Sequence, residues 1–504
     1  MSRVVVIGAG LAGLAAACHL AGDGHDVTVV ERAADPGGRN GVLDADGFRF
    51  DTGPTVLTMP HLLDRAFARL GRHREAELPL IRLDPAYRAL YADGSQLLVR
   101  EKAADQVAEL RRNGLAADAA AYPGFVRWLE QLYEVEVPNF IERNFDTPLD
   151  LLSRPVEAAR LVRLGGFGSL EKAVSRHFRD PRLVRLFTFQ AMYAGLAPAE
   201  ALAIYAVITY MDCIAGVWFP PGGMHQVPRA LAAALTDSGV ELRYSAPATR
   251  LLRDATGKLA GVEAGGERLL ADAVVVTTDL PTAYAELLPE LRRPRVLDRA
   301  KYSPSALVWH LGVRGRPAAE VAHHNIHFAE AWARSFDELI KRRQVMSDPS
   351  RLVTVPTIDA PELAPAGHSM LYVLEPVPHL GAGIDWVTER EPARERLLGF
   401  LQANGYPTDI VTEHLVTPAD WAAQGLAMGT PFSLAHTFTQ TGPFRPPNVE
   451  RRVPGVFFAG SGTTPGVGVP MVLISGEQAA VRVRDYLGAG ARAATSRPLA
   501  GAGR

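Results

Sequence analysis

Three glycines and a glutamate near the amino terminus have the types and the spacing that bind a dinucleotide. Gly8, Gly10 and Gly13 form the pattern GxGxxG, and Glu31 follows them. The first glycine permits a tight turn, the second lets the backbone approach a pyrophosphate, and the third lets a helix pack on a sheet. A carboxylate at position 31 can accept hydrogen bonds from both ribose hydroxyls, and its charge repels a 2′-phosphate. These residues therefore predict a site for the adenosine end of a dinucleotide.

The segments around these residues have the character that such a site needs. Residues 3–7 (RVVVI) and 26–30 (DVTVV) are β-branched runs typical of buried parallel strands, and residues 14–21 are rich in Ala and Leu. A helix that begins beside the glycines offers unpaired N–H groups and a partial positive charge to phosphates. The order strand, glycine turn, helix, strand, acid favours a Rossmann-type unit over a chance glycine-rich turn.

A second glycine pair follows the acid and resembles the extended signature of flavoproteins such as amine oxidases. Gly37 and Gly38 allow close backbone approach to a cofactor, and Arg39 can pair with its phosphates. Residues 48–55 (FRFDTGPT) then predict a strand end and a sharp turn, which includes Gly53 and Thr55, as a wall near the isoalloxazine. The alternative is two unrelated glycine-rich turns.

A third segment with glycines lies near the carboxyl end. Residues 457–480 read FFAGSGTTPGVGVPMVLISGEQAA, in which a strand should stop near Gly460. A helix is predicted over 472–483, and its amino terminus would stabilise negative charge on a reduced flavin ring. The cofactor residues expected in this segment are Gly460, Ser461, Gly462, Gly468, Val469, Pro470 and Met471.

Composition excludes several other classes of protein. The chain has 504 residues, of which 47% are hydrophobic and 21% are charged, so it can bury large cores. A formal net charge of −2 is not that of a general nucleic-acid binder. Two cysteines, Cys18 and Cys213, have no metal-ligand spacing and build no disulfide framework, which fits a reducing cytosol.

The motifs are scattered along the chain, which predicts a discontinuous α/β fold. We expect a Rossmann-type FAD-binding domain made of residues 1–61, 221–290 and 446–488. Residues 62–220, mainly helical in pattern, and residues 291–445 should form an inserted mixed α+β substrate domain with a helical membrane-facing region. The Gly-, Ala- and Arg-rich residues 489–504 are predicted to be a disordered tail.

Nearly the whole chain resembles bacterial carotenoid desaturases of the phytoene desaturase type. The segments VWFPPGGM, YVLEPVPHLG and AGSGTTPGVGVP carry this resemblance most specifically. It implies FAD as the organic cofactor, an apolar polyene or carotenoid substrate, and peripheral attachment to the inner, cytoplasmic face of a membrane. It also implies that Ala248 contacts the adenine through its backbone. Ser461 and Met471 stand where relatives often have Ala and Gly, and Met471 should lie close to the flavin ring.

The resemblance also implies a mechanism without metal. Hydride would pass from an allylic carbon to flavin N5, and a proton would then leave the neighbouring carbon of the resulting cation. Oxygen or a quinone would accept the electrons. No strong base is required, but Asp150 is a candidate acid near the substrate tunnel, with Arg154 one turn later. The alternative is that Asp150 is an acid at the amino terminus of a helix and that Arg154 is a surface arginine. The histidines in 323–327 (HHNIH) lack a following acid, so a metal site is not expected there.

Two further segments bear on the membrane. Residues 155–167 are amphipathic, and they form either a helix in the lipid headgroup layer or a helix packed on its own domain. Residues 196–219 are apolar but contain Pro198, Glu200 and Asp212, so a buried helix is expected rather than a spanning one. The apolar residues 4–20 are interpreted as mature structure and not as a signal peptide.

Other functions share parts of these motifs. A flavin amine or porphyrinogen oxidase would have the same amino-terminal signature, and carotenoid isomerases or saturases would share nearly all of it. A noncatalytic prenyl-lipid escort protein uses a related fold, but flavin motifs at both ends of the chain argue against it. The motifs suit phytoene, a diapo-carotenoid analogue, a hydroxylated carotenoid intermediate or another polyene.

Overall fold

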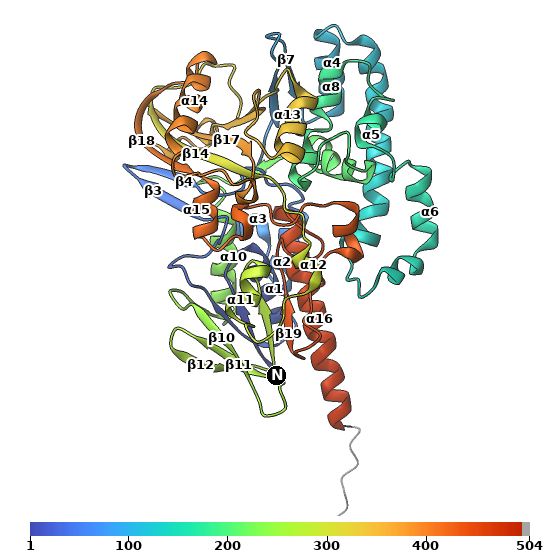
Figure 1. The fold of residues 1–504 in the computed structure, drawn as a ribbon, viewed down its shortest axis with the longest axis vertical. Helices are drawn as coiled ribbons and strands as arrows, with labels where there is room; N and C mark the ends of the chain where they lie inside the picture. Colours follow the sequence, from blue (N-terminus) through green and yellow to red (C-terminus); the bar gives the residue numbers. More distant parts are fainter. Residues whose placement is uncertain (496–504) are drawn as a thin grey trace, which may run out of the picture.

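A computed structural model describes residues 1–495 of the chain (Figure 1). The last helix, α16 (Val469–Thr495), begins earlier and ends later than the predicted 472–483. The prediction of a disordered tail is therefore wrong for residues 489–495, which continue this helix, and residues 496–504 lie outside the described part.

A five-stranded parallel sheet carries the predicted Rossmann unit. Its order is β19-β13-β1-β2-β9, formed by β1 (Arg3–Ile7), β2 (Asp26–Val30), β9 (Glu241–Arg243), β13 (Ala273–Val276) and β19 (Val456–Phe458). The central strands are almost wholly buried, as expected for β-branched runs covered on both faces. Ile7 pairs with Val276 and with Val30, so the carboxyl ends of β13, β1 and β2 meet at one edge.

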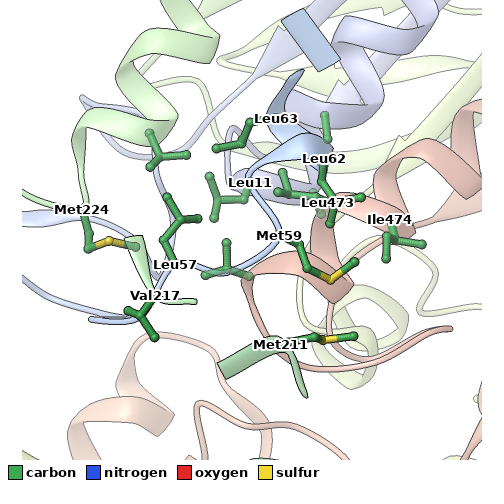
Figure 2. Packing of buried hydrophobic residues seen from close by; sticks show 14 of the residues in the cluster. Leu11, Leu57, Met59, Leu62, Leu63, Met211, Val217, Met224, Leu473 and Ile474 are labelled. Atoms are coloured by element: carbon green, nitrogen blue, oxygen red, sulfur yellow. The ribbon is translucent and has the colours of Figure 1, made fainter. Parts of the chain in front are cut away.

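Helices cover one face of this sheet and a small sheet covers the other. Helix α1 (Leu11–Gly22) packs against α16, α10 (Gln226–Asp237) and α2 (His61–Arg69). Figure 2 shows the core at this junction, where Leu11, Leu62 and Leu473 meet. On the opposite face lie β10 (Ala248–Arg253), β11 (Leu259–Ala264), β12 (Glu267–Leu270) and α11 (Leu280–Glu286).

A second, seven-stranded sheet stands above the first (Figure 1). Its order is β18-β14-β17-β16-β15-β6-β7, and only β15–β6 is parallel. The strands are β6 (Tyr87–Leu90), β7 (Gln96–Val99), β14 (Ser305–Arg314), β15 (His324–His327), β16 (Arg351–Thr354), β17 (His368–Val377) and β18 (Asp409–Val416). The β6–β7 hairpin lies in the region predicted to be mainly helical. Its short strands form because β6 also pairs with β15, which is distant in the sequence.

The remaining lobe is helical and holds α4 (Ala103–Arg112), α5 (Ala116–Glu136), α6 (Pro155–Arg163), α7 (Leu170–Val174), α8 (Pro181–Leu186) and α9 (Ala206–Thr209). The single buried helix predicted over 196–219 is wrong. That segment is broken into a 3₁₀ turn (Ala203–Tyr205), α9, a π-helix (Tyr210–Ala215) and β8 (Trp218–Phe219), and Gly216 ends the π-helix with a φ of 106°. Over residues 1–495, no helix combines the length and the apolar composition needed to cross a membrane.

Eight further α-helices and β-strands complete the fold of residues 1–495. They are β3 (Val42–Ala45), β4 (Phe48–Asp51), β5 (Ile81–Arg82), α3 (Arg74–Glu77), α12 (Arg295–Asp298), α13 (Trp332–Phe336), α14 (Arg390–Ala403) and α15 (Pro418–Ala423). Helix α14 packs on the seven-stranded sheet, where Leu397 and Leu401 join Trp309 in a separate core.

Candidate functional site

The glycine turn between β1 and α1 has the conformation that its sequence predicts. Gly8 has a φ of 104°, and a Cβ there would lie 2.3 Å from Thr277 Oγ1. A Cβ on Gly13 would lie 2.0 Å from the carbonyl oxygen of Gly8, so this glycine allows the helix to pack closely on the turn. A Cβ on Gly10 would meet no atom closer than the Gly37 carbonyl oxygen at 3.9 Å, and this residue borders an open cavity. Backbone at Gly10 is therefore accessible to a ligand.

Glu31 lies buried at the end of β2 and faces the same cavity. Its Oε2 accepts a hydrogen bond from Ala9 N at 2.7 Å, and its Oε1 accepts one from Ala33 N at 2.9 Å. Each carboxylate oxygen has room for a second donor, because an ionised carboxylate accepts about four hydrogen bonds. The backbone thus orients Glu31 so that it can receive both hydroxyls of a ribose.

The second glycine pair lies directly against the first turn. Gly37 N donates to Ala9 O at 2.9 Å, and both Gly37 and Gly38 have positive φ, at 130° and 57°. Gly53 is required on the other side, because a Cβ there would lie 1.9 Å from Arg39 O. The carbonyl oxygen of Thr55, on the same turn, lies 3.1 Å from His324 Nε2.

Arg39 links this turn to the carboxyl-terminal segment. Its guanidinium donates to Ser461 Oγ at 2.5 Å and to Asp279 Oδ1 at 3.3 Å. Burial lowers the pKa of Arg39 while the charge of Asp279 opposes that shift, and burial raises the pKa of Asp279. The predicted phosphate partner is thus already paired, and a phosphate would share the guanidinium with Asp279.

Sequence reasoning did not single out Asp279, although it follows β13 at the same edge as Gly8 and Glu31. Its position in the sequence indicates such a role, because Asp279 comes just after the buried strand in AVVVTTDL. Ligands of open α/β sheets bind outside the carboxyl ends of the strands.

The carboxyl-terminal loop is held from within by residues that the sequence analysis also missed. Strand β19 ends at Phe458, close to the predicted end at Gly460. The fully buried Arg445 donates to the carbonyl oxygens of Ser461 (2.6 Å) and Thr463 (3.0 Å), and Ser475 Oγ accepts from Gly460 N at 3.0 Å. These bonds fix the loop that delivers Gly460 and Gly468 to the cavity.

One cavity of about 1550 Å³ brings the three segments together. Its wall includes every cofactor residue predicted from the sequence apart from Gly13, which acts in packing: Gly8, Gly10, Glu31, Gly37, Gly38, Arg39, Gly53, Thr55, Ala248, Gly460, Ser461, Gly462, Gly468, Val469, Pro470 and Met471. The same cavity continues into the helical lobe, where Phe140, Leu161 and Phe167 line it.

Comparison with known proteins assigns the family. The profile of the family described as flavin containing amine oxidoreductase matches residues 11–484. The chain belongs to this family. It is 50% identical over 489 residues to a phytoene dehydrogenase of Streptomyces griseus, with 96% of this chain and 95% of that protein covered. It is 38% identical to a zeta-carotene-forming phytoene desaturase of Myxococcus xanthus, with 99% and 98% covered.

Solved structures show the same fold at low identity. A putrescine oxidase bound to putrescine superposes with a TM-score of 0.57 at 17% identity, with 96% of this chain and 99% of that chain covered. An oxidoreductase from Methanosarcina mazei gives 0.62 at 18% identity, with 96% and 100% covered. The family match and the relatives at 50% and 38% identity confirm the resemblance inferred from the motifs, and FAD is the cofactor. The turn around Gly10, with Glu31 beside it, fits the adenosine diphosphate half of FAD.

The two candidate catalytic residues lie away from this site. The Asp150 carboxylate accepts from Asp146 N at 2.6 Å and from Thr147 N at 3.0 Å, so it caps a 3₁₀ turn (Pro148–Ser153) at the surface. These backbone hydrogen bonds hold its pKa below the ordinary value. Arg154 lies 4.0 Å from Glu157. Neither side chain lines the cavity, whereas Leu151 between them does.

The histidines at 323, 324 and 327, in and just before β15, are used in packing. His323 pairs with Asp359 at 2.7 Å, His324 lies between the carbonyls of Ala86 and Thr55, and His327 bonds Tyr406 at 3.0 Å. Among residues 1–495, no group of three or more His, Cys, Asp or Glu side chains is arranged to hold a metal ion.

Exposed apolar side chains gather at the end of the cavity that is formed by α6 and the turn before it. Leu149, Leu152, Val156 and Val162 are 71%, 74%, 66% and 65% exposed. On the inner side of the same elements, Leu151, Ala158 and Leu161 line the cavity. The helix thus has two apolar faces, one toward the cavity and one toward solvent.

Proposed function

We propose that this chain is an FAD-dependent desaturase that removes two hydrogens from a long apolar polyene, phytoene or a related carotenoid intermediate. The observation that carries the proposal is one continuous cavity of about 1550 Å³. It extends from the glycine turn around Gly10 and Glu31 to the apolar side chains of the helical lobe. Small-molecule pockets ordinarily measure about 300–1,000 Å³, so this cavity has room for a cofactor and a long second ligand. The relatives named phytoene dehydrogenase and phytoene desaturase, which match nearly the whole chain, support the same substrate class.

The chain's own residues bind, orient and exclude water. Glu31 would hold the ribose, the backbone near Gly10 and Gly38 would hold the pyrophosphate, and Ala248 would contact the adenine through its backbone. The start of α16, near Gly468, would lie at the flavin ring, and its free N–H groups would stabilise negative charge there. When bound, FAD supplies the acceptor for the hydride that leaves the polyene. Oxygen or a quinone would take the electrons afterwards.

We propose the same domain division that the motifs suggest. Residues 1–61, 221–290 and 446–488 would form the FAD domain, and they include all five strands of the parallel sheet. Residues 62–220 and 291–445 would form the substrate domain, which includes the seven-stranded sheet and the helical lobe.

Pigment formation tests the reaction. The chain should be expressed in cells that accumulate phytoene, and the carotenoids should then be extracted and separated. We expect products with more conjugated double bonds, and a purified protein that is yellow from bound flavin. A yellow protein that leaves phytoene unchanged would contradict the substrate, and altered isomers or more saturated products would indicate an isomerase or a saturase.

We also propose that the protein attaches peripherally to a membrane, at its inner, cytoplasmic face, through α6. A hydrocarbon polyene dissolves in lipid and hardly in water, so a cavity for it should open at lipid. The exposed face of α6 bears Val156 and Val162, with Arg160 and Arg163 beside them, which is the pattern of a helix that lies in the headgroup layer.

Vesicle flotation tests this attachment. The holoprotein should float with vesicles of anionic lipid at low salt, and Val156→Asp combined with Val162→Asp should leave most of it at the bottom. Val387→Asp, which changes another exposed valine that lies outside α6, is the matched control and should float normally. Failure of the wild type to float, or equal flotation of all variants, would contradict α6 as the anchor.

A further inference from the structure

A buried acid, Asp212, faces the cavity from the helical lobe, and neither cofactor binding nor membrane attachment uses it. It lies in the π-helix Tyr210–Ala215, is 3% exposed, and lines the cavity together with its neighbour Met211. Burying a carboxylate beside apolar side chains costs free energy unless hydrogen bonds compensate, so such a group in a folded protein calls for a functional explanation. π-Helical turns occur often at functional sites because the extra residue redirects a side chain.

Tyrosine hydroxyls surround this carboxyl group. Tyr87 OH, on β6, donates to Asp212 Oδ2 at 3.1 Å. Tyr193, on the 3₁₀ turn Phe189–Ala194, provides a second hydroxyl and also lines the cavity. Burial raises the pKa of Asp212 to about 7, and the two tyrosine hydrogen bonds oppose that shift. An acid that titrates near neutral pH is suited to accept a proton in one step and to release it in the next.

Two contacts connect this group to the flavin wall. The Tyr87 ring packs on the His324 ring at 5.4 Å, and His324 Nε2 lies 3.1 Å from Thr55 O. Thr55 lines the same cavity as Asp212, on the side of the cofactor motifs. The acid is thus placed between the apolar lobe that would hold the polyene and the turn that would border the flavin.

We propose that Asp212 is the residue that accepts the proton lost in desaturation. The inference rests on the proposed function. One C–H bond of the saturated unit breaks and its hydrogen leaves with both electrons to FAD. The neighbouring C–H bond then breaks, its electrons form the new C=C bond, and its proton moves to the Asp212 carboxylate. Its negative charge also stabilises the cation between these steps. Oxygen or a quinone would take the two electrons afterwards, and Asp212 would return to its carboxylate form by releasing the proton to water.

Other ionisable groups near the cavity must be separated from Asp212. Tyr87 on β6, Tyr193 and the neighbouring Cys213 are the titratable groups around its carboxyl, and burial raises the pKa of all three, so none of them ionises near neutral pH. His324 lies behind Tyr87, and burial lowers its pKa far below the ordinary value. Glu136, at the end of α5, also lines the cavity, and its Oε1 is buried without a hydrogen-bond partner among the described residues. Glu136 is therefore the rival acid.

The test is anaerobic reduction of the flavin in the holoenzyme, with phytoene supplied in vesicles and the loss of oxidised-flavin absorbance followed in time. In the wild type the rate should rise with pH through about 7, as Asp212 loses its proton. Asp212→Asn should slow the rate about 100-fold and remove this pH dependence, since positioned acid–base groups contribute roughly 10²–10⁴-fold. Asp212→Glu should restore part of the rate. Asp118→Asn, which neutralises a buried acid of α5 outside the cavity, should match the wild type.

Tyr87→Phe supplies a second readout that does not depend on the stability of Asp212→Asn. Because the Tyr87 hydroxyl lowers the pKa of Asp212, its removal should shift the midpoint of the pH profile upward. Equal rates in the wild type and Asp212→Asn, an unmoved midpoint in Tyr87→Phe, or loss of the pH dependence in Glu136→Gln instead would each overturn the assignment. No flavin reduction by phytoene in the wild type would contradict the proposed desaturase itself, which is a different result.

Discussion

At the scale of single residues, the proposed cofactor site depends on side chains that the backbone holds in place before any ligand arrives. Glu31 is the main example, because each of its carboxylate oxygens is bonded to a backbone N–H of a different turn. Such preorganisation lowers the entropy lost when the ribose binds.

Replacing Glu31 by Ala should weaken FAD binding. The change removes the acceptors for the ribose hydroxyls and also leaves the N–H groups of Ala9 and Ala33 without this partner. Since hydrogen bonds to charged groups contribute about 1.5–3 kcal/mol, we expect affinity to fall about 10- to 100-fold. Titration of the apoprotein with FAD measures this, and Glu241→Ala, at an exposed position of β9, is the control. Equal affinity in both variants would contradict the role of Glu31.

At the scale of elements, buried polar side chains join segments that are far apart in the sequence. Arg445 binds the carbonyls of the loop that precedes α16, and Asp51 at the end of β4 accepts from Met224 N at 2.7 Å and from His225 N at 2.8 Å, just before α10. Both residues secure turns that border the cofactor site.

Arg445→Met should destabilise the loop before α16. It would leave several buried carbonyl oxygens unpaired, which we expect to lower the free energy of unfolding by about 3 kcal/mol. FAD should also be retained less well, because the loop carries Ser461 and Gly468. Chemical denaturation measures the stability, and Arg451→Met is the control, since its exposed ion pair with Asp146 should contribute at most about 1 kcal/mol. A small effect of Arg445→Met would show that the loop is held by other contacts.

Asp51 should make stability depend on pH in a direction that its burial fixes. Burial raises its folded-state pKa from 3.8 to about 6, so between these values the folded state binds the proton that the unfolded state has released. The contribution of Asp51 to the free energy of unfolding is therefore complete below about pH 4, where its carboxyl is protonated in both states. This contribution is lost as the pH rises toward 6. Relative to Asp51→Asn, the free energy of unfolding of the wild type should fall by up to about 3 kcal/mol over this range. Parallel pH profiles for the two proteins would contradict this.

At the scale of the whole molecule, the cavity couples both sheets and the helical lobe, because its wall takes residues from each of them. A ligand that fills the cavity binds the folded state and not the unfolded chain. Cofactor binding and global stability should therefore be linked.

Removal of FAD should lower the midpoint of thermal unfolding, and added FAD should restore it in a concentration-dependent manner. At a free concentration about 100 times Kd, the linkage contributes about 2.7 kcal/mol. Thermal unfolding of the apoprotein across a series of FAD concentrations measures this, with AMP as a comparison ligand that fills only the Glu31 end. A midpoint that does not respond to FAD would mean that the cofactor does not bind the folded cavity.

What the sequence alone determined is local. The order of strand, glycine turn, helix and acid predicted the β1–α1–β2 unit, since a positive φ at Gly8 and a close approach at Gly13 depend on residues that are neighbours in the chain. The three cofactor segments could be recognised one by one for the same reason. The family resemblance added the substrate class.

The tertiary structure alone decided which distant residues meet. The β6–β7 hairpin is extended by β15, which pairs with β6. Residues 196–219 form several short elements instead of one helix, and Tyr205, Ile208 and Met211 among them line the cavity. Asp279, Arg445 and Asp212 gain their positions from contacts with residues far away in the chain. Burial shifts the pKa of each of these groups, upward for Asp279 and Asp212 and downward for Arg445. Burial is a property of the assembled molecule that no local pattern of residues contains.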